Sequence, residues 1–351
     1  MTILDNAKIV RPEVLEILDL IQRLREQSAA VFLGAPENQV LDFGALWSKI
    51  MEGNARWFAG ENVSGLLTRP EQLFIARQHR FAVEYRAAAL QSSHPTPDVH
   101  VGSADADGTA AEWQVVPEAR PDRVVLYFHG GGYIMGSPSF MRILSVKIGR
   151  ATRSRVLSVD YRLAPEHPFP AGQEDCVRSY RWLLASGLDP RRIVIAGDSA
   201  GGYYTLTTLL RIRDEGLPLP AGGLCLAPGT DLALAGRSYV TNGATDPVLA
   251  DLGVFWWVEA YLAGADPRDP TVSPLYADLH GLPPLLIQVS ASEMLLDDAL
   301  MFAERAGEAG VDVALQIWDD TLHVFQQFDL PESAEALAGI GEFAHTLFGG
   351  R

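Results

Sequence analysis

The chain has 351 residues, of which 48% are hydrophobic and 21% are charged. This composition is ordinary for a globular protein and excludes wholesale disorder, because a disordered chain holds too few large apolar residues to build a core. The formal net charge of −16 makes nucleic acid and anionic membrane surfaces unfavourable partners, so we expect a globular protein that binds neither.

The two cysteines, Cys176 and Cys225, stand in apolar surroundings and form no Cys-x-x-Cys pair. We predict that both are small core residues rather than parts of a disulfide framework. The first residues show no basic segment followed by an apolar run, and no apolar stretch approaches the roughly 18 residues of a membrane span. The sequence therefore predicts a soluble, cytoplasmic protein without a signal peptide.

The first part of the chain is predicted to be helical. Apolar residues recur at helical spacing over residues 12–30, 36–60 and 70–91, and the first and third of these segments begin at a proline, which suits a first helical turn. No alternating strand pattern precedes about residue 98, and residues 92–97 break the helical pattern. We therefore expect a mainly helical unit over residues 1–95, followed by a second unit over residues 96–351.

Strands and helices alternate in the second unit. Short apolar runs predict strands at residues 124–128, 155–160, 192–196, 223–227, 284–289 and 313–318. Helices are predicted at about 139–151, 171–186, 200–214, 247–262, 295–309 and 332–347. This alternation predicts an α/β fold with a mostly parallel central sheet flanked by helices. The Gly-, Pro-, Asp- and Thr-rich segments 229–246 and 264–282 are expected to be long loops over the site.

A serine motif lies between a predicted strand and a predicted helix. The segment Gly197-Asp198-Ser199-Ala200-Gly201-Gly202 matches G-x-S-x-G in the strand–turn–helix context that defines a nucleophile elbow. Such a turn is sharp and strained, so side chains two residues away on either side of the serine would collide. The motif predicts Ser199 as a nucleophile; an ordinary glycine-rich turn is the alternative.

A glycine-rich segment, His129-Gly130-Gly131-Gly132-Tyr133, directly follows the strand predicted at residues 124–128. Consecutive glycines leave backbone N–H groups uncovered, and such donors stabilise the oxyanion of a tetrahedral intermediate. The alternative is a flexible loop. The two motifs support each other, because an oxyanion hole of this type needs one N–H beside the serine and another from an earlier loop.

The serine also needs a base and an orienting acid. Among eight histidines, His323 follows the last predicted strand, which fits the chain order of serine, acid and histidine. Glu293 is the first carboxylate after the strand that ends at residue 289, so we assign it as the acid that accepts the imidazole N–H. Asp297 is the alternative, although it lies one turn later, where carboxylates suit the start of a helix.

Taken together, these motifs resemble the hormone-sensitive-lipase-like esterases, bacterial family IV of the α/β-hydrolase superfamily. The resemblance covers about residues 98–348 and includes Asp160-Tyr-Arg-Leu-Ala-Pro-Glu-His-Pro-Phe-Pro-Ala171, Asp269-Pro-Thr-Val-Ser-Pro-Leu275 and His323-Val-Phe325. It implies an α/β-hydrolase fold with a helical N-terminal cap, to which residues 231–265 contribute, over a catalytic domain. It also implies that the N–H groups of Gly131, Gly132 and Ala200 form the oxyanion hole.

Two segments depart from the family pattern. Many members carry Asp-Pro-Leu where this chain has Glu293-Met294-Leu295, and the Ser-x-Glu-x-Leu-Leu-Asp-Asp run resembles a branch that includes acetyl hydrolases and ε-lactone hydrolases. Relatives often place a bulky aromatic before Thr230-Asp231, whereas this chain has Gly229, which would enlarge a pocket wall. We interpret Asp198 and the segment 160–171 as structural supports of the glycine loop rather than as catalytic groups.

The motifs predict hydrolysis of a small-molecule ester through an acyl-enzyme, with no metal and no cofactor, and the resemblance implies short acyl chains. An ε-lactone hydrolase or an amidase would use the same triad, because pocket shape sets specificity. A non-catalytic ligand-binding relative is disfavoured because a serine, a histidine and a candidate acid are all present. A dehydrogenase is disfavoured because no G-x-G-x-x-G motif follows an early strand. The resemblance is compatible with a homodimer, although no feature of the sequence itself indicates one.

Overall fold

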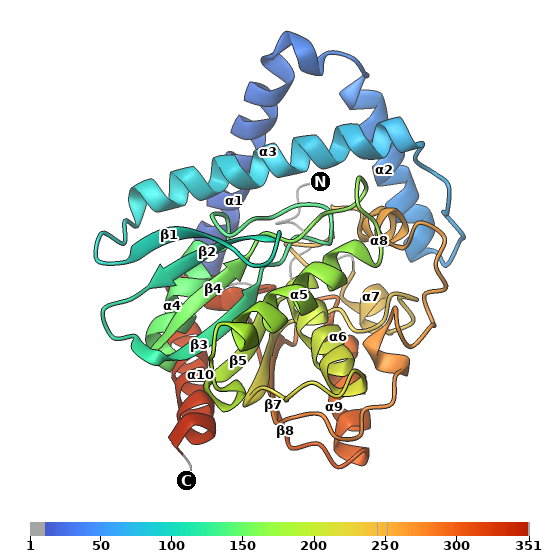
Figure 1. The fold of residues 1–351 in the computed structure, drawn as a ribbon. Helices are drawn as coiled ribbons and strands as arrows, with labels where there is room; N and C mark the ends of the chain where they lie inside the picture. Colours follow the sequence, from blue (N-terminus) through green and yellow to red (C-terminus); the bar gives the residue numbers. More distant parts are fainter. Residues whose placement is uncertain (1–10, 244, 251, 350–351) are drawn as a thin grey trace.

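The computed structural model describes residues 11–243, 245–250 and 252–349. Its central feature is an eight-stranded sheet in the order β1-β2-β4-β3-β5-β6-β7-β8 (Figure 1). The pairs from β4 through β3 to β8 are parallel, and β1 and β2 join antiparallel at one edge. This arrangement confirms the mostly parallel sheet. The strands are β1 His100–Asp105, β2 Ala110–Val115, β3 Arg120–Phe128, β4 Ser154–Val159, β5 Ile193–Asp198, β6 Gly222–Leu226, β7 Leu285–Ser290 and β8 Val313–Trp318.

Helices cover both faces of the sheet, as predicted. On one face α4 (Arg142–Thr152) packs against α10 (Pro331–Gly349), and on the other lie α5 (Ala171–Ala185), α6 (Ala200–Asp214) and α9 (Leu296–Glu308) (Figure 1). Successive strand residues point to opposite faces, so Val125 and Leu126 of β3 belong to two different apolar clusters. Cys176 and Cys225 are fully buried and unpaired, which confirms their interpretation as core residues.

The N-terminal segment consists of α1 (Pro12–Gly34), α2 (Phe43–Phe58) and α3 (Arg69–Ser93). Figure 1 shows α3 crossing above the sheet, with α1 and α2 extending beyond it. Local signals set the helix starts: Pro12 opens α1, and a capping box pairs Thr68 with Glu71 at the start of α3. The helix predicted from residue 36 begins only at Phe43, because the Asp42 side chain accepts the N–H of Ala45 and caps it there.

The long connection from β6 to β7, residues 227–284, contains α7 (Ser238–Thr241) and α8 (Val254–Leu262). The helix predicted over residues 247–262 starts later than expected. Asp246 accepts the N–H groups of Val248 and Leu249 in a turn of its own, and Gly253, with φ of 70°, precedes the first residue of α8. The later start follows from the left-handed backbone at Gly253, which a helix cannot include.

No helix in the described part of the chain combines the length and the apolar character that a bilayer crossing requires. Residues 1–10, on which the expectation about a signal peptide rests, lie outside the described part.

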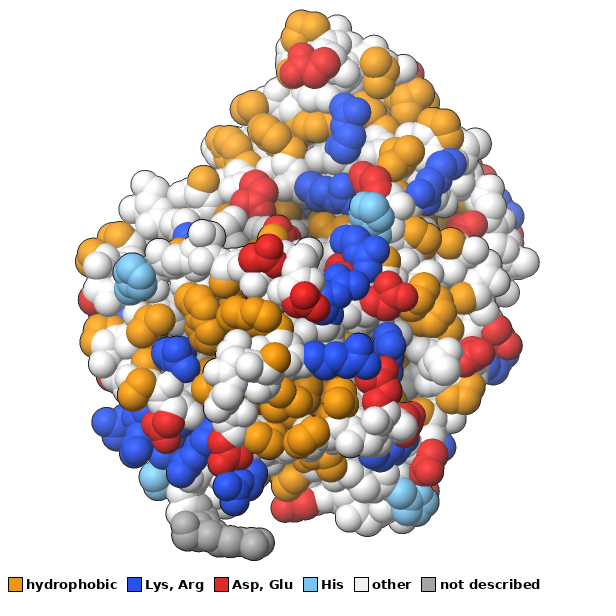
Figure 2. Space-filling model, viewed as in Figure 1, with side chains coloured by type: hydrophobic (Ala, Val, Ile, Leu, Met, Phe, Trp, Pro, Cys, Tyr) orange, Lys and Arg blue, Asp and Glu red, His pale blue; other side chains and the backbone are white. Residues whose placement is uncertain are grey.

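Figure 2 shows acidic and basic side chains mixed across the face viewed, so the negative net charge does not form a single acidic patch on that face.

Candidate active site

The candidate site lies at the carboxyl ends of the parallel strands. Ser199 follows β5, the glycine loop follows β3, Glu293 follows β7 and His323 follows β8. Because neighbouring parallel strands end at the same edge, these four loops converge there. Ser199, His323 and the glycines 130–132 line one cavity of about 400 Å³.

Ser199 occupies a strained bend. Its φ of 53° and ψ of −118° lie outside the regions that residues with a side chain favour, and its N–H is held 2.7 Å from the carbonyl oxygen of Leu226. A Cβ atom on Gly201 would lie only 1.9 Å from the carbonyl oxygen of Phe128, so the first turn of α6 passes too close to β3 for any other residue. The bend thus places Ser199 at the N-terminus of α6, as the motif predicted.

The glycine loop and the start of α6 present free backbone donors. Within the described residues, no backbone hydrogen bond uses the N–H groups of Gly131, Gly132 or Ala200. Gly131 has a φ of 129°, and a Cβ there would lie 2.1 Å from the carbonyl oxygen of Met135. The loop therefore depends on glycine for its left-handed backbone and for its close approach to the Met135 carbonyl.

Buried side chains fix the glycine loop from behind. Asp198 accepts hydrogen bonds from the Tyr127 hydroxyl and, at 3.0 Å, from the N–H of Gly130. Burial raises the pKa of Asp198 to about 6, although the Tyr127 hydrogen bond lowers it. The Tyr161 ring stacks on His129 at a centroid distance of 4.2 Å, and its hydroxyl donates to the His129 carbonyl at 2.5 Å. Both contacts agree with the structural interpretation of Asp198 and of the segment 160–171.

His323 and Glu293 form a buried pair. The Nδ1 atom of His323 lies 3.3 Å from Oε1 of Glu293, and their side chains are only 7% and 1% exposed. The alternative acid, Asp297, lies in the first turn of α9 and accepts the backbone N–H of Ser238 at 3.0 Å. In the described part of the chain, His323 forms its ion pair with Glu293 and not with Asp297.

The electrostatics of this pair suit a base that is oriented by an acid. Burial alone would lower the pKa of His323, but the Glu293 carboxylate, aided by Asp246 and Asp198, raises it above the ordinary value. Burial raises the pKa of Glu293, while His323 opposes that shift. Glu293 thus stabilises the protonated imidazole, which is the form that a histidine base reaches during a reaction.

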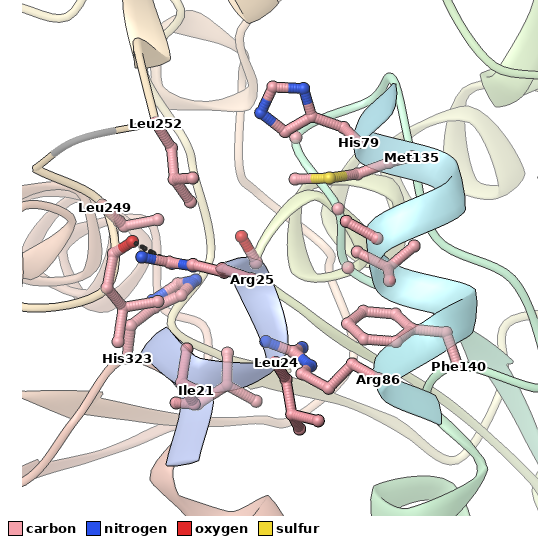
Figure 3. A pocket seen from close by; sticks show the side chains of 18 of the residues that line it. Ile21, Leu24, Arg25, His79, Arg86, Met135, Phe140, Leu249, Leu252 and His323 are labelled. Atoms are coloured by element: carbon pink, nitrogen blue, oxygen red, sulfur yellow. Dashed lines mark hydrogen bonds between the residues drawn. The ribbon is translucent and has the colours of Figure 1, made fainter. Parts of the chain in front are cut away.

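The cavity of about 400 Å³ is walled largely by the N-terminal segment. Figure 3 shows Ile21, Leu24 and Arg25 on α1 and His79 and Arg86 on α3. Phe43 and Trp47 of α2 line the same cavity. The sequence motifs did not identify Arg25, His79 or Arg86 as residues of the site. The one sequence feature that could have indicated them is the presence of a polar residue on the apolar face of an amphipathic helix.

A second, smaller cavity of about 40 Å³ adjoins the first one. Both cavities are lined by Ser199, Gly132 and Trp257. The small cavity is otherwise mostly apolar, and Gly229 forms part of its wall. A Cβ atom on Gly229 would meet a single neighbour, the Tyr133 hydroxyl oxygen at 3.2 Å. The absence of a side chain at position 229 therefore leaves space beside Ser199.

Comparison with known proteins places the chain in a family. A family described as having the alpha/beta hydrolase fold matches residues 125–327. An acetyl-hydrolase of Streptomyces hygroscopicus is 44% identical over 241 residues, which cover 68% of this chain and 80% of that protein. An esterase of Acinetobacter venetianus is 33% identical over 310 residues, which cover 88% of this chain and 99% of that protein.

A solved structure shows the same relationship in three dimensions. The crystal structure of an esterase from the bacterial hormone-sensitive lipase family aligns with a TM-score of 0.74 and 42% identity, covering 88% of this chain and 100% of that one. The sheet order, the family match and these relatives agree with one another. The chain therefore belongs to the α/β-hydrolase-fold family and, within it, to the hormone-sensitive-lipase-like esterases.

Proposed function

We propose that the protein is a serine carboxylesterase that hydrolyses short-chain acyl esters through an acyl-enzyme. The observation that carries the proposal is the convergence of Ser199, His323 and the unused N–H groups of the glycine loop at one cavity. The acetyl-hydrolase and esterase names of its relatives support the same chemistry.

In the acylation step, His323 accepts the hydroxyl proton of Ser199 while Oγ attacks the ester carbonyl carbon. The N–H groups of Gly131, Gly132 and Ala200 donate to the oxyanion, where their contribution is large because the donors are already in place. Glu293 holds the imidazole and stabilises its charge. The tetrahedral intermediate collapses when His323 returns the proton to the leaving alcohol, which leaves the acyl group on Ser199.

In the deacylation step, a water molecule takes the place of the alcohol. His323 removes a proton from the water, the resulting hydroxide attacks the acyl carbonyl, and the same N–H groups hold the oxyanion. The proton then passes from His323 to Oγ of Ser199, and the carboxylic acid departs. These steps need only residues of this chain and water.

The preference for short acyl groups is supported by the small cavity beside Ser199. A volume of about 40 Å³ holds only a few water-sized groups, since each needs about 10–15 Å³. We assign this cavity to the acyl tail and the cavity of about 400 Å³ to the alcohol part of the ester. We further propose that residues 1–95, with residues 231–265, act as a cap over the catalytic domain of residues 96–351.

Other expectations stay predictions. Hydrolysis of ε-lactones or amides would use the same groups. A cytoplasmic location is supported by the unpaired, buried cysteines Cys176 and Cys225. A homodimer also stays a prediction.

The proposed function is tested with p-nitrophenyl acetate and the Ser199→Ala variant. We expect wild-type turnover, and a loss of kcat approaching the roughly 10⁶-fold that removal of a triad serine causes in other hydrolases. A matching thermal unfolding curve establishes that the variant is folded. A folded variant that retains most of the wild-type kcat would show that Ser199 is not the nucleophile.

A further inference from the structure

Arg86 brings a cationic side chain to the candidate active site. It extends from α3 into the cavity of about 400 Å³ that Ser199 and His323 also line (Figure 3). Its guanidinium carbon lies 4.6 Å above the centroid of the Phe140 ring, another residue of the cavity wall. This stacking orients the planar group but supplies no negative charge.

Arg86 lacks a carboxylate partner among the described residues. Its Nε atom is buried without a hydrogen-bond partner, and no ion pair there includes the guanidinium. Burial, with the positive charge of Arg25, lowers the pKa of Arg86 to about 10, so the group is still cationic near neutral pH. Arg86 as a whole is only partly buried, but its Nε–H is removed from water without a partner, which is unfavourable, and an anionic ligand would offset that cost.

Among the described residues, no other ionisable group of the cavity wall forms an ion pair with Arg86. These groups are Arg25, Glu26, His79, Asp198 and His323. Burial lowers the pKa of His79 to about 4, so this ring is neutral. The Asp198 carboxylate accepts hydrogen bonds from the Tyr127 hydroxyl and the Gly130 N–H. The Glu26 carboxylate is exposed and accepts a 2.8 Å hydrogen bond from Gln22.

Arg25 adds a second cation on the facing helix. It extends from α1, lines the same cavity and donates a 3.2 Å hydrogen bond to the Val248 carbonyl oxygen (Figure 3). Arg25 thus brings a second guanidinium group to the wall of the cavity that Arg86 lines.

We propose that Arg86 is a specificity residue that binds a carboxylate on the alcohol part of the ester, so that the preferred substrates are short-chain acyl esters of carboxylate-bearing alcohols. The inference rests on the proposed esterase function, because the same Ser199 performs the reaction. The planar guanidinium matches a carboxylate with two parallel hydrogen bonds, and the apolar wall accommodates the carbon skeleton between the carboxylate and the ester.

The test compares two esters that differ only in charge: 4-(acetoxymethyl)benzoate, which is anionic, and 4-(acetoxymethyl)benzamide, which is neutral. We expect the wild type to favour the anionic ester. In Arg86→Gln, kcat/KM for the anionic ester should fall at least about tenfold, mainly through a higher KM, while the value for the neutral ester changes less than about twofold.

Arg23→Gln is the matched control. Arg23 lies on α1, the helix of Arg25, but it is exposed, pairs with Asp19 and is not among the residues that line the cavity. This variant removes the same charge from the protein and should leave both kcat/KM values unchanged. An equal loss for both esters in Arg86→Gln would assign Arg86 a structural role and overturn the proposal, as would the absence of a wild-type preference for the anionic ester.

A measurement on the wild type alone keeps the proposal falsifiable if Arg86→Gln does not fold. The product 4-(hydroxymethyl)benzoate should inhibit p-nitrophenyl acetate hydrolysis at least about tenfold more strongly than 4-(hydroxymethyl)benzamide, and added salt should reduce that difference. Equal inhibition would overturn the proposal. Failure of the esterase proposal looks different, because p-nitrophenyl acetate would then not be hydrolysed at all.

Discussion

The backbone N–H of Met294 donates a 2.9 Å hydrogen bond to the Oδ2 atom of Asp246. The other carboxylate oxygen of Asp246 accepts the N–H groups of Val248 and Leu249, both at 2.9 Å. Asp246, which is fully buried, therefore joins the segment that lines the large cavity to the loop that carries Glu293. Its negative charge also raises the pKa of His323, so one side chain contributes to both the shape and the electrostatics of the site.

The identity of the acid is tested by Glu293→Gln. The amide keeps the size of the side chain but no longer stabilises a protonated His323, so we expect kcat for p-nitrophenyl acetate to fall by about 10³-fold or more. Steady-state kinetics near neutral pH measure the effect.

Asp297→Asn is the control for that substitution, because Asp297 was the alternative acid. Its carboxylate accepts the N–H of Ser238 in the first turn of α9, so we expect a loss of stability below about 1 kcal/mol and a kcat close to the wild-type value. If Asp297→Asn lost activity and Glu293→Gln retained it, the two roles would be reversed.

The activity should decline on the acid side with the titration of His323. His323 must be neutral to accept the Ser199 proton. We therefore expect kcat/KM to have its full value above the pKa of His323 and to decrease as the pH falls through that pKa. The nearby carboxylates raise that pKa above the ordinary 6.5, which places the midpoint of the acid limb above that value. A pH profile of kcat/KM with an uncharged ester measures it.

Removing the charge of Asp246 should shift this profile. Because Asp246 raises the pKa of His323, Asp246→Asn should move the midpoint of the acid limb to lower pH. Asp319→Asn serves as a comparison, since Asp319 is exposed. A midpoint in Asp246→Asn that stays in place or moves to higher pH would show that its charge does not act on the base.

The elbow should tolerate no side chain at Gly201. A methyl group there would lie 1.9 Å from the carbonyl oxygen of Phe128, so Gly201→Ala should lower the free energy of unfolding by about 3 kcal/mol or more. Gly307→Ala is the matched control: this helical glycine has open space around it, and alanine should stabilise α9 by roughly 0.5 kcal/mol. Denaturant unfolding of both variants checks the contrast.

Acyl selectivity should respond to Gly229. An added methyl group enters the small cavity and meets only the Tyr133 hydroxyl, so the protein should fold normally. We expect Gly229→Ala to lower the ratio of kcat/KM for p-nitrophenyl butyrate over acetate by about threefold or more, because a pocket discriminates single methylene groups by about tenfold or more. An unchanged ratio would place the acyl tail elsewhere.

The central sheet was predictable because its buried parallel strands are continuous apolar runs, such as residues 193–196 of β5. Strands β1 and β2 were not predicted. They form the antiparallel edge, β1 has only exposed and partly buried residues, and β2 buries only Ala111 and Gln114 fully, so both give a weak hydrophobic signal. The late start of α8 was missed as well, because it depends on the backbone at Gly253 and on the capping of residues 248 and 249 by Asp246.

Some residues of the candidate site could be predicted from the sequence, and others could not. Ser199, the glycine loop, Glu293 and His323 could be proposed from the sequence because each directly follows a recognisable strand. Arg86 could not, since its position depends on how α3 packs over the sheet. Asp246 could not either, because its contact with Met294 joins the long connection before β7 to the loop after β7, across 48 positions of the chain.

The large cavity is lined by two different parts of the chain, and this has a consequence for how substrate preference can change among homologues. The groups assigned to bond cleavage sit on turns anchored in the sheet, whereas Leu24, Trp47 and Arg86 come from helices that precede the first strand. Substitutions in those helices can alter which alcohol is accepted without disturbing the reaction centre. Homologues with the same hydrolytic apparatus should therefore differ most in their preferred molecules where their opening hundred residues diverge.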